Sequence, residues 1–394
     1  MKKLILVILP LYGCAAYTQL SEHISEKVSL SVNTNIETYY IAEKLAVEHI
    51  GNYVFSNKTT QFTHQPLVCY AQKEFTKWTN SPIILRIADI LRQLRDKYHD
   101  NAQTLEYLLY RNEFPDTGYR WPPPATLHVF DTKESKALTL ELSDSLASFY
   151  RQANVGSFLK RNASYYKGAL AEARKHINRR AIPYMEKWYG HQFAAYELYL
   201  MPGMPITPGK DNYRAFGPML ISPKGEVSAM VFSSSIELPL EKSLKDYQHF
   251  GFDNADVIRF LTVHEIGHSF VNPVMKPMTA DIQHDTSLFS PALAKALAPS
   301  YIDGWENCII EHLVRLGEIR IAVAMDDTTE ASRLRKLHIN EFKFALLPLL
   351  EKKIVEYEND RSKYPNFNSF LPEIFDMFHN LKPEDVDKAV ARAH

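Results

Sequence analysis

The spacing of apolar positions changes along this 394-residue chain. Residues 28–34 alternate between apolar and polar, and this period of two predicts a strand. Further along, apolar positions recur every three or four residues, which is typical of amphipathic helices. On this basis helices are predicted over residues 36–50, 66–79, 82–98, 102–110, 143–152 and 161–188.

The pattern returns to strands in the middle of the chain and then to helices. Strands are predicted at 192–200, 217–222 and 227–233, with Pro223-Lys224-Gly225 as a turn. An apolar helix over 253–270 follows, then a mixed loop over 274–300 and helices at 301–325, 331–358, 370–379 and 383–392. We therefore expect an α+β fold, predominantly α, in which a small antiparallel or mixed sheet precedes the apolar helix and the C-terminal part is helical.

The run Trp121-Pro122-Pro123-Pro124 predicts a rigid extended connector. We place a boundary there, between a mainly helical N-terminal region at 17–120 and a second region at 121–394. A loop inside one continuous domain fits the same residues.

Candidate chemistry lies in the apolar helix. Asp253 or Asn254 can cap it, and Asn272-Pro273 is expected to end it, Asn272 acting as a plain terminator. Within it His264, Glu265 and His268 have the spacing His-Glu-x-x-His. Residues four apart share a helix face, so the two imidazoles can bind one metal ion beside the Glu265 carboxylate. The alternative is a helix with two hydrogen-bonded core histidines and a surface glutamate.

A catalytic zinc usually has three protein ligands. Positions 271 and 274 are valines, so the extended motif with a third nearby histidine is absent. The candidates downstream are Asp281, His284, Asp285, Glu306, Glu311 and Glu318. We favour Glu311 because apolar residues surround it in the helix at 301–321, with Arg315 and Glu318 on the same face. A buried Glu311–Arg315 pair without a metal is the alternative.

These motifs resemble a known class. HEIGH followed by a glutamate on a later helix resembles the gluzincin branch of the zincin metallopeptidases. HEIGHSFVNP, EHLVR at 311–315 and VSLSVNTNIE at 28–37 are similar to an uncharacterised family of exported bacterial proteins, a domain of unknown function.

The resemblance implies a zincin-like core that hydrolyses peptide bonds in a peptide or protein substrate. It assigns one Zn²⁺ to His264, His268 and Glu311, with Glu265 as general base. Tyr301, Tyr213 and Arg315 are conceivable helpers for the oxyanion. An exported surface-binding or scaffold protein with a structural or catalytically silent metal site is the alternative, although a structural site needs no base. A helical protein without metal is a third possibility.

Composition limits the classes of binding partner that the chain is expected to have. The net charge is -1, with 45% hydrophobic and 23% charged residues, so nothing favours a nucleic acid. Neither substrate specificity nor oligomeric state follows from the sequence.

The N-terminus predicts export. A basic start and a short apolar run at 4–12 are typical of a signal peptide, here residues 1–16, too short to span a membrane. Leu-Tyr-Gly-Cys at 11–14 resembles a lipoprotein signal, with cleavage before Cys14 and membrane attachment through its lipid. We therefore expect a periplasmic, outer-membrane or cell-surface lipoprotein; cleavage near Ala16 would instead give a secreted protein. Cys69 and Cys308 then remain, enough for one disulfide but not requiring it.

Overall fold

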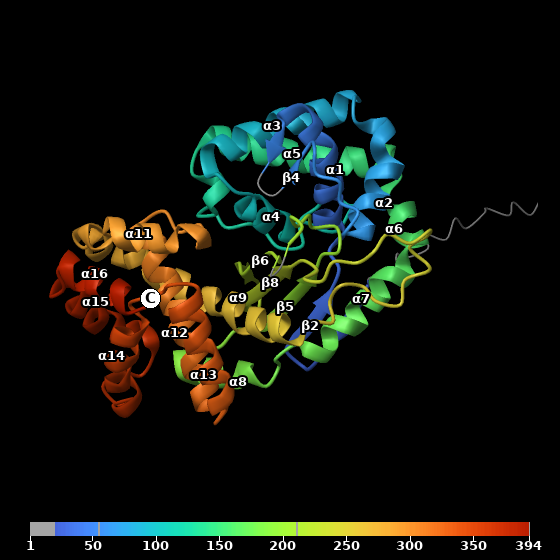
Figure 1. Cartoon of the computed structure of the whole chain (residues 1–394). Coiled ribbons are helices and arrows are strands. Elements are labelled where there is room, and N and C mark those ends of the chain that lie inside the picture. Colours follow the sequence, from blue (N-terminus) through green and yellow to red (C-terminus); the bar gives the residue numbers. More distant parts are fainter. Residues whose placement is uncertain (1–19, 54–55, 210–211, 394) are drawn as a thin grey trace, which may run out of the picture.

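A computed structural model describes residues 20–53, 56–209 and 212–393 of the chain. It has the predicted α+β architecture, predominantly helical, with one small mixed sheet near the middle (Figure 1). The predicted signal peptide and Cys14 lie outside the described residues.

The main sheet contains strands from both sides of the domain boundary predicted at Trp121. It is built from β1 (Ser21–His23), β2 (Val28–Ser31), β5 (Ala195–Leu200), β6 (Ala215–Phe216), β7 (Met219–Ser222) and β8 (Gly225–Phe232). Strands β2, β5 and β8 run parallel, β1 is antiparallel to β2, and both β6 and β7 are antiparallel to β8. Leu30, Leu198 and Met230 lie in register across the parallel strands and are fully buried, as expected for a sheet covered on both faces.

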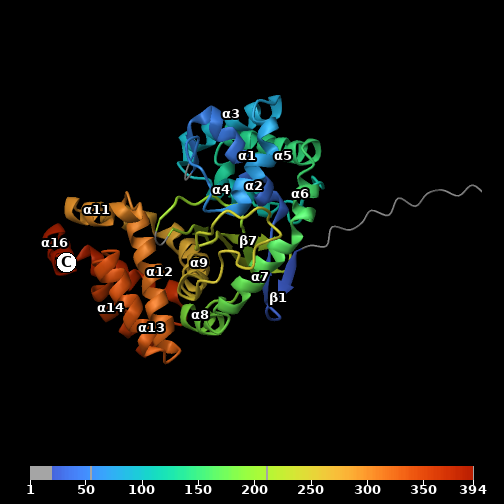
Figure 2. The same cartoon turned by 45° about the vertical axis from the view of Figure 1, so that its right-hand side comes forward.

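The helices of the N-terminal part gather on one side of the sheet in both views (Figures 1 and 2). They are α1 (Thr34–Ile50), α2 (Pro66–Phe75), α3 (Pro82–Tyr98), α4 (Ala102–Leu109), α5 (Lys133–Gln152) and α6 (Val155–Arg161), with a short hairpin of β3 (Asn52–Tyr53) and β4 (Ser56–Asn57). The predicted helix at 143–152 is only the second half of α5. Its first half was missed because two polar residues, Ser135 and Thr139, occupy buried positions there and weaken the apolar pattern. The Thr132 side chain caps the helix by accepting from Ser135 N.

The predicted helix at 161–188 is wrong as a single element. It is divided into α7 (Ala163–His176) and α8 (Ala181–Tyr189). Ile177 leaves the helical region with φ −56° and ψ 121°. Pro183 lies in the first turn of α8, where a missing N–H costs no helical hydrogen bond.

Helix α9 (Ala255–Met275) carries the His-Glu-x-x-His motif and packs against β8 and α12. The Asn254 side chain caps it by accepting from Val257 N. The expected end at Asn272 is wrong, because Pro273 lies inside the helix. Proline removes one hydrogen bond near the helix end, and the continued turn brings Met275 into the core.

The C-terminal part forms a second group of helices beside α9 (Figure 1). They are α10 (Thr279–His284), α11 (Pro291–Leu297), α12 (Trp305–Ala324), α13 (Thr328–Arg335), α14 (Leu347–Asn359), α15 (Leu371–His379) and α16 (Pro383–Arg392). Short 3-10 turns lie at Thr76–Trp78, His128–Phe130, Lys276–Met278, Thr286–Leu288, Ala298–Ser300 and Phe367–Phe370. The predicted loop at 274–300 is therefore wrong: it is a series of short helical segments, with Pro277 and Pro291 in first turns.

The predicted helix at 331–358 is also wrong as one element. It is interrupted by a π-helical segment over Lys336–Glu341 and by the turn before α14.

Both free cysteines, Cys69 and Cys308, are buried, and they do not pair. No helix among the described residues has the length and apolarity needed to cross a membrane.

Candidate metal centre

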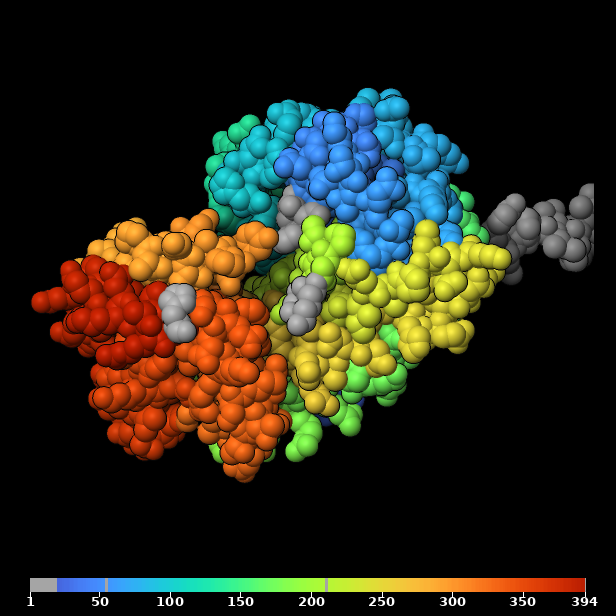
Figure 3. Space-filling model, in the orientation of Figure 1, coloured from blue at the N-terminus to red at the C-terminus, as the bar shows by residue number. Residues whose placement is uncertain are grey.

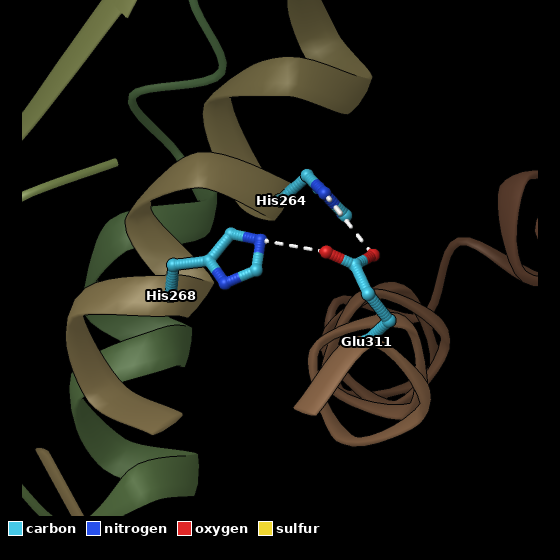
Figure 4. A group of neighbouring side chains, drawn as sticks. All are labelled: His264, His268 and Glu311. Atoms are coloured by element: carbon cyan, nitrogen blue, oxygen red, sulfur yellow. Dashed lines mark ion pairs between the residues drawn. The ribbon is translucent and has the colours of Figure 1, made fainter. Parts of the chain in front are cut away.

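Three predicted ligands meet between two packed helices. His264 and His268 extend from successive turns of α9, and Glu311 reaches them from α12 (Figure 4). Glu311 Oε1 lies 3.3 Å from His268 Nε2, and Oε2 lies 3.7 Å from His264 Nε2. Ligand atoms of the three side chains all lie within 4.8 Å of one another.

Glycines allow the close approach of the elements that support this group. A Cβ on Gly267 of α9 would lie 3.2 Å from Val314 of α12, a tight contact. A Cβ on Gly317 of α12 would lie 2.1 Å from the Tyr189 hydroxyl of α8, which no real side chain tolerates. The ligand geometry therefore depends on small residues on the facing helix surfaces.

A second set of polar side chains holds the ligands in a defined orientation. His264 Nδ1 donates to Glu318 Oε1 at 2.7 Å, so its Nε2 carries the lone pair directed toward Glu311. His338 Nε2 donates to Glu318 Oε2 at 2.9 Å, and Arg315 donates to His338 Nδ1 at 3.3 Å. Arg315 also pairs with Glu311 Oε2 at 3.1 Å, which closes a ring of contacts around the ligands. Arg315 and Glu318 thus share the face of α12 that carries Glu311, as their spacing predicts.

His338 was not found from the sequence. It is fully buried and lies in the π-helical segment that replaced the predicted continuous helix. Its position 20 residues beyond Glu318 gave no spacing signal. A π-bulge often marks a functional position, but no pattern in this sequence predicts one here.

Asn272 has more than the terminator role expected of it. His268 Nδ1 donates to Asn272 Oδ1 at 3.2 Å, which leaves Nε2 directed at Glu311. The continuation of α9 past residue 272 makes this possible, because residues four apart share a face. Both histidines are thereby fixed with Nε2 toward the carboxylate.

The electrostatics suit a cation between these side chains. Burial acts to raise the pKa of Glu311, but His264, His268 and Arg315 together hold it below its usual range. Burial lowers the pKa of His264, which favours the neutral imidazole that binds metals. Burial opposes protonation of His268 too, yet its hydrogen bond to Glu311 raises the pKa of His268 to about 9. A bound metal ion would take the place of the proton shared by His268 and Glu311.

The donor atoms fit a zinc ion. Two imidazole nitrogens and one carboxylate are a common ligand set for catalytic zinc. Glu311 Oε2 is buried and, although near Arg315, accepts no well-directed hydrogen bond from the described residues. Such an oxygen retains a lone pair for a cation.

The predicted general base faces a cavity of about 370 Å³ together with the three ligands. Residues from α4, the β6–β7 segment, α9 and α12 line it: Ala102, Gln103, Glu106, Ala215, Phe216, Gly217, Pro218, His264, Glu265, His268, Asn272 and Glu311. These elements meet near the centre of Figure 1, and Figure 3 shows a hollow between the N-terminal helices (blue to cyan) and the C-terminal helices (orange). Burial raises the pKa of Glu265 to about 7, a range suited to a general base.

The other candidates are not members of this group. Tyr301 is 84% exposed, and the Tyr213 ring packs against the Phe260 ring, which in turn packs against His264. Glu306 is exposed on the first turn of α12. Neither the two tyrosines nor Glu306 lines the cavity described above.

The remaining candidates form a different cluster. Asp281, His284 and Asp285 gather around His379 of α15. His284, Asp285 and His379 also offer ligand atoms within 4.8 Å, as do Glu172, His249 and Asp253. His284 and His249 are largely exposed, however, whereas every member of the first group lines the cavity beside Glu265.

Comparison with known proteins places the chain in a family without assigning a function. Residues 132–377 match the domain of unknown function DUF4932. The chain belongs to this family. No curated protein and no solved structure matches it. The family segment contains α9 and α12, and thus the three ligands and Glu265, but it begins after α4.

Proposed function

We propose that this DUF4932 protein is a zinc-dependent hydrolase of peptide bonds. The observation that carries the proposal is the convergence of His264, His268 and Glu311 on the wall of a cavity that Glu265 also lines. A structural metal site requires ligands but neither a carboxylate base beside them nor access to a cavity. The match to a domain of unknown function favours neither a catalytic nor a structural metal site.

The side chains have distinct tasks. When bound, zinc supplies Lewis acidity that polarises a carbonyl and makes water easier to deprotonate. Glu265 accepts a proton from the water whose oxygen forms the new bond to the carbonyl carbon. It then passes that proton to the amine nitrogen as the C–N bond breaks. Glu318 and Asn272 keep both imidazoles oriented throughout.

The sheet edge beside the cavity suits an extended substrate. Strand β6 is the last strand in the described order of the sheet, and Ala215 and Phe216 line the cavity. A peptide placed along this edge can pair with the backbone and pass in front of Glu265. This arrangement favours a polypeptide over a compact small molecule as substrate.

The test combines metal analysis with a base variant of the mature chain. Purified protein should contain one zinc per chain, and it should cleave casein or a peptide library. Glu265→Gln should keep the zinc and lose about 10²- to 10⁴-fold in rate. The exposed Glu306→Gln serves as the matched control and should retain full activity. Stoichiometric zinc with no cleavage, or equal rates for wild type and Glu265→Gln, would reject the peptidase proposal.

We also propose that the chain is exported and carries a lipid on Cys14, on the strength of its N-terminal sequence. Mass spectrometry of the mature N-terminus, together with membrane fractionation of wild type and Cys14→Ser, tests this. A soluble mature protein beginning near residue 17 would contradict the lipid anchor and favour secretion.

A further inference from the structure

The wall of the cavity opposite the motif helix carries hydrogen-bond acceptors that lack donors. Gln103 and Glu106 lie one turn apart on α4 and both line the cavity. Gln103 Oε1 is buried and accepts no hydrogen bond from the described residues, while the amide group of that side chain is engaged with the Asp100 carboxylate. Within the described part of the chain nothing donates to the Glu106 carboxylate either. Residues three apart share a helix face, so the two acceptors point the same way.

Gln103 and Glu106 are both half-buried, and the Glu106 carboxylate faces the cavity with no donor from the described part of the protein beside it. A desolvated carboxylate without a donor destabilises the fold by more than a neutral group of the same shape. Burial accordingly raises the pKa of Glu106 to about 7, and only Lys276 opposes the shift. An unpaired polar group of this kind calls for a partner from outside the fold, such as water, an ion or a ligand, and a perturbed carboxylate in a cavity is a candidate for ligand binding.

Lys276 does not supply that partner. It is exposed in the turn after α9, does not line the cavity and forms no ion pair with Glu106, so it acts on the Glu106 carboxylate only through space. The charged residues that do line the cavity are Glu106, Glu265 and Glu311, with His264 and His268; no lysine or arginine of the described chain is among them. The cavity thus favours a cationic group with several N–H donors.

We propose that Gln103 and Glu106 form the binding site for a positively charged group of the substrate, placed across the cavity from the zinc ligands. The proposal rests on the proposed function and specifies its substrate class. Two sources share this chemistry: the free α-ammonium of a peptide, which makes the protein an aminopeptidase, and a lysine or arginine side chain near the scissile bond. The carboxylate binds the charge, and Gln103 Oε1 accepts a further N–H.

The test measures binding separately from cleavage. Zinc-loaded Glu265→Gln protein is titrated with defined peptide pools of matched length: free amino terminus, acetylated terminus, and acetylated terminus with one internal lysine or arginine. We expect the free-terminus pool or the internal-cation pool to bind about 10- to 100-fold more tightly than the neutral pool, as for hydrogen bonds to a charged group. Whichever pool shows the gain identifies the source of the charge.

Adding Glu106→Gln should abolish this selectivity while leaving the affinity for the neutral pool unchanged. Lys276→Gln and the exposed Glu306→Gln are the controls and should preserve selectivity. Circular dichroism checks folding, and Glu106→Gln should be as stable as its parent or more stable, because it removes a buried charge. Destabilisation of both Glu106→Gln and Lys276→Gln would instead indicate a structural ion pair.

Equal affinity for charged and neutral pools, selectivity that survives Glu106→Gln, or no binding of any pool would overturn the inference. These outcomes differ from failure of the proposed function, which is judged by the cleavage rates of wild type and Glu265→Gln. Cation-selective binding without cleavage would support the binding site and reject the peptidase.

Discussion

At the scale of single residues, Glu318 connects the candidate metal centre to His338 and so to the neighbouring C-terminal helices. One carboxylate oxygen accepts from His264 and the other from His338, and both donors are buried. Arg315 links His338 back to Glu311 and packs its guanidinium over the Phe344 ring, 4.2 Å from the ring centre. The orientation of the ligands is therefore set by side chains that would not touch a metal themselves.

Replacement of Glu318 by glutamine tests this support. The amide offers one acceptor oxygen in place of two, so either His264 or His338 loses its partner. We expect zinc affinity to fall by about 10- to 100-fold, the usual effect of losing an outer-shell partner. Competition with a metal-sensitive dye measures the affinity, and Glu306→Gln on the same helix is the control. Unchanged affinity would show that Glu318 does not orient His264.

The sequence could predict which three side chains meet at the candidate metal centre but only part of their support. His264, Glu265 and His268 follow from helical spacing, and Glu311 follows from a carboxylate among apolar neighbours on a second helix. Gln103, Glu106 and His338 come from distant segments, and only the tertiary fold brings them to the cavity. Asn272 was misinterpreted because its neighbour Pro273 gave the stronger local signal.

At the scale of elements, the position of the sheet edge against α9 depends on Gly217. A Cβ at this position would lie 1.9 Å from the Glu265 carbonyl oxygen, closer than any real contact. Gly217 links β6 to β7. The backbone of this link therefore packs directly against the turn of α9 that carries Glu265, the proposed general base, and forms one wall of the cavity.

Gly217→Ala should force the β6–β7 link and α9 apart. We expect a loss of about 1–3 kcal/mol in the free energy of unfolding, typical of overpacking, and a further loss of cleavage rate per folded molecule. Gly304→Ala is the matched control, because a Cβ there meets nothing within 4 Å. Urea unfolding and peptide cleavage measure the two effects. Equal stability of the two variants would contradict the close approach.

The contact between α10 and α15 gives a pH-dependent contribution to stability. His379 Nδ1 lies 2.8 Å from Asp285 Oδ2, and its Nε2 lies 3.3 Å from Asp281 Oδ1. The hydrogen bond to Asp285 raises the pKa of His379 above the ordinary 6.5. Protonated His379 thus stabilises the fold fully below pH 6.5, and the contribution is lost as pH rises through the folded-state pKa.

His379→Gln removes this contribution. Urea unfolding of wild type and variant between about pH 5 and 9, with a chelator present, should show a stability difference that shrinks as the pH rises. The chelator matters because His284, Asp285 and His379 lie close enough to bind a stray metal ion. A constant difference over this range would contradict the ion pair as its source.

Sequence patterns predicted that most elements exist, but they predicted several element boundaries wrongly. The strands before α9 were predicted because they are short, largely apolar runs, two of them separated by the turn residues Pro223-Lys224-Gly225. The π-helical segment and the continuation of α9 through Pro273 were not predicted. In both places the tertiary contacts of a buried residue, His338 or Met275, outweigh the local conformational preference of the sequence.

At the scale of the whole molecule, the cavity is lined by residues from inside and from outside the segment that matches the family. Helix α4 supplies Gln103 and Glu106, whereas the family segment begins at residue 132. Strand β2 also precedes that segment, yet it pairs in parallel with β5 over four residues. Glu37 of α1 accepts from Gly203 N at 3.0 Å and from the Tyr166 hydroxyl. The N-terminal region therefore completes both the sheet and the site.

A fragment covering residues 132–394 tests whether the family segment is an independent domain. It would lack β2, leaving one edge of β5 and the buried row at Leu198 without a partner, and it would lose the α4 wall. We expect it to be insoluble or to unfold without a cooperative transition, because an exposed apolar strand edge promotes aggregation. The chain from residue 20 to 394 is the matched control and should unfold cooperatively. Circular dichroism and size-exclusion chromatography distinguish the two. A soluble, cooperatively folded fragment with native zinc affinity would instead place a true domain boundary near Trp121 and confine the N-terminal helices to substrate binding.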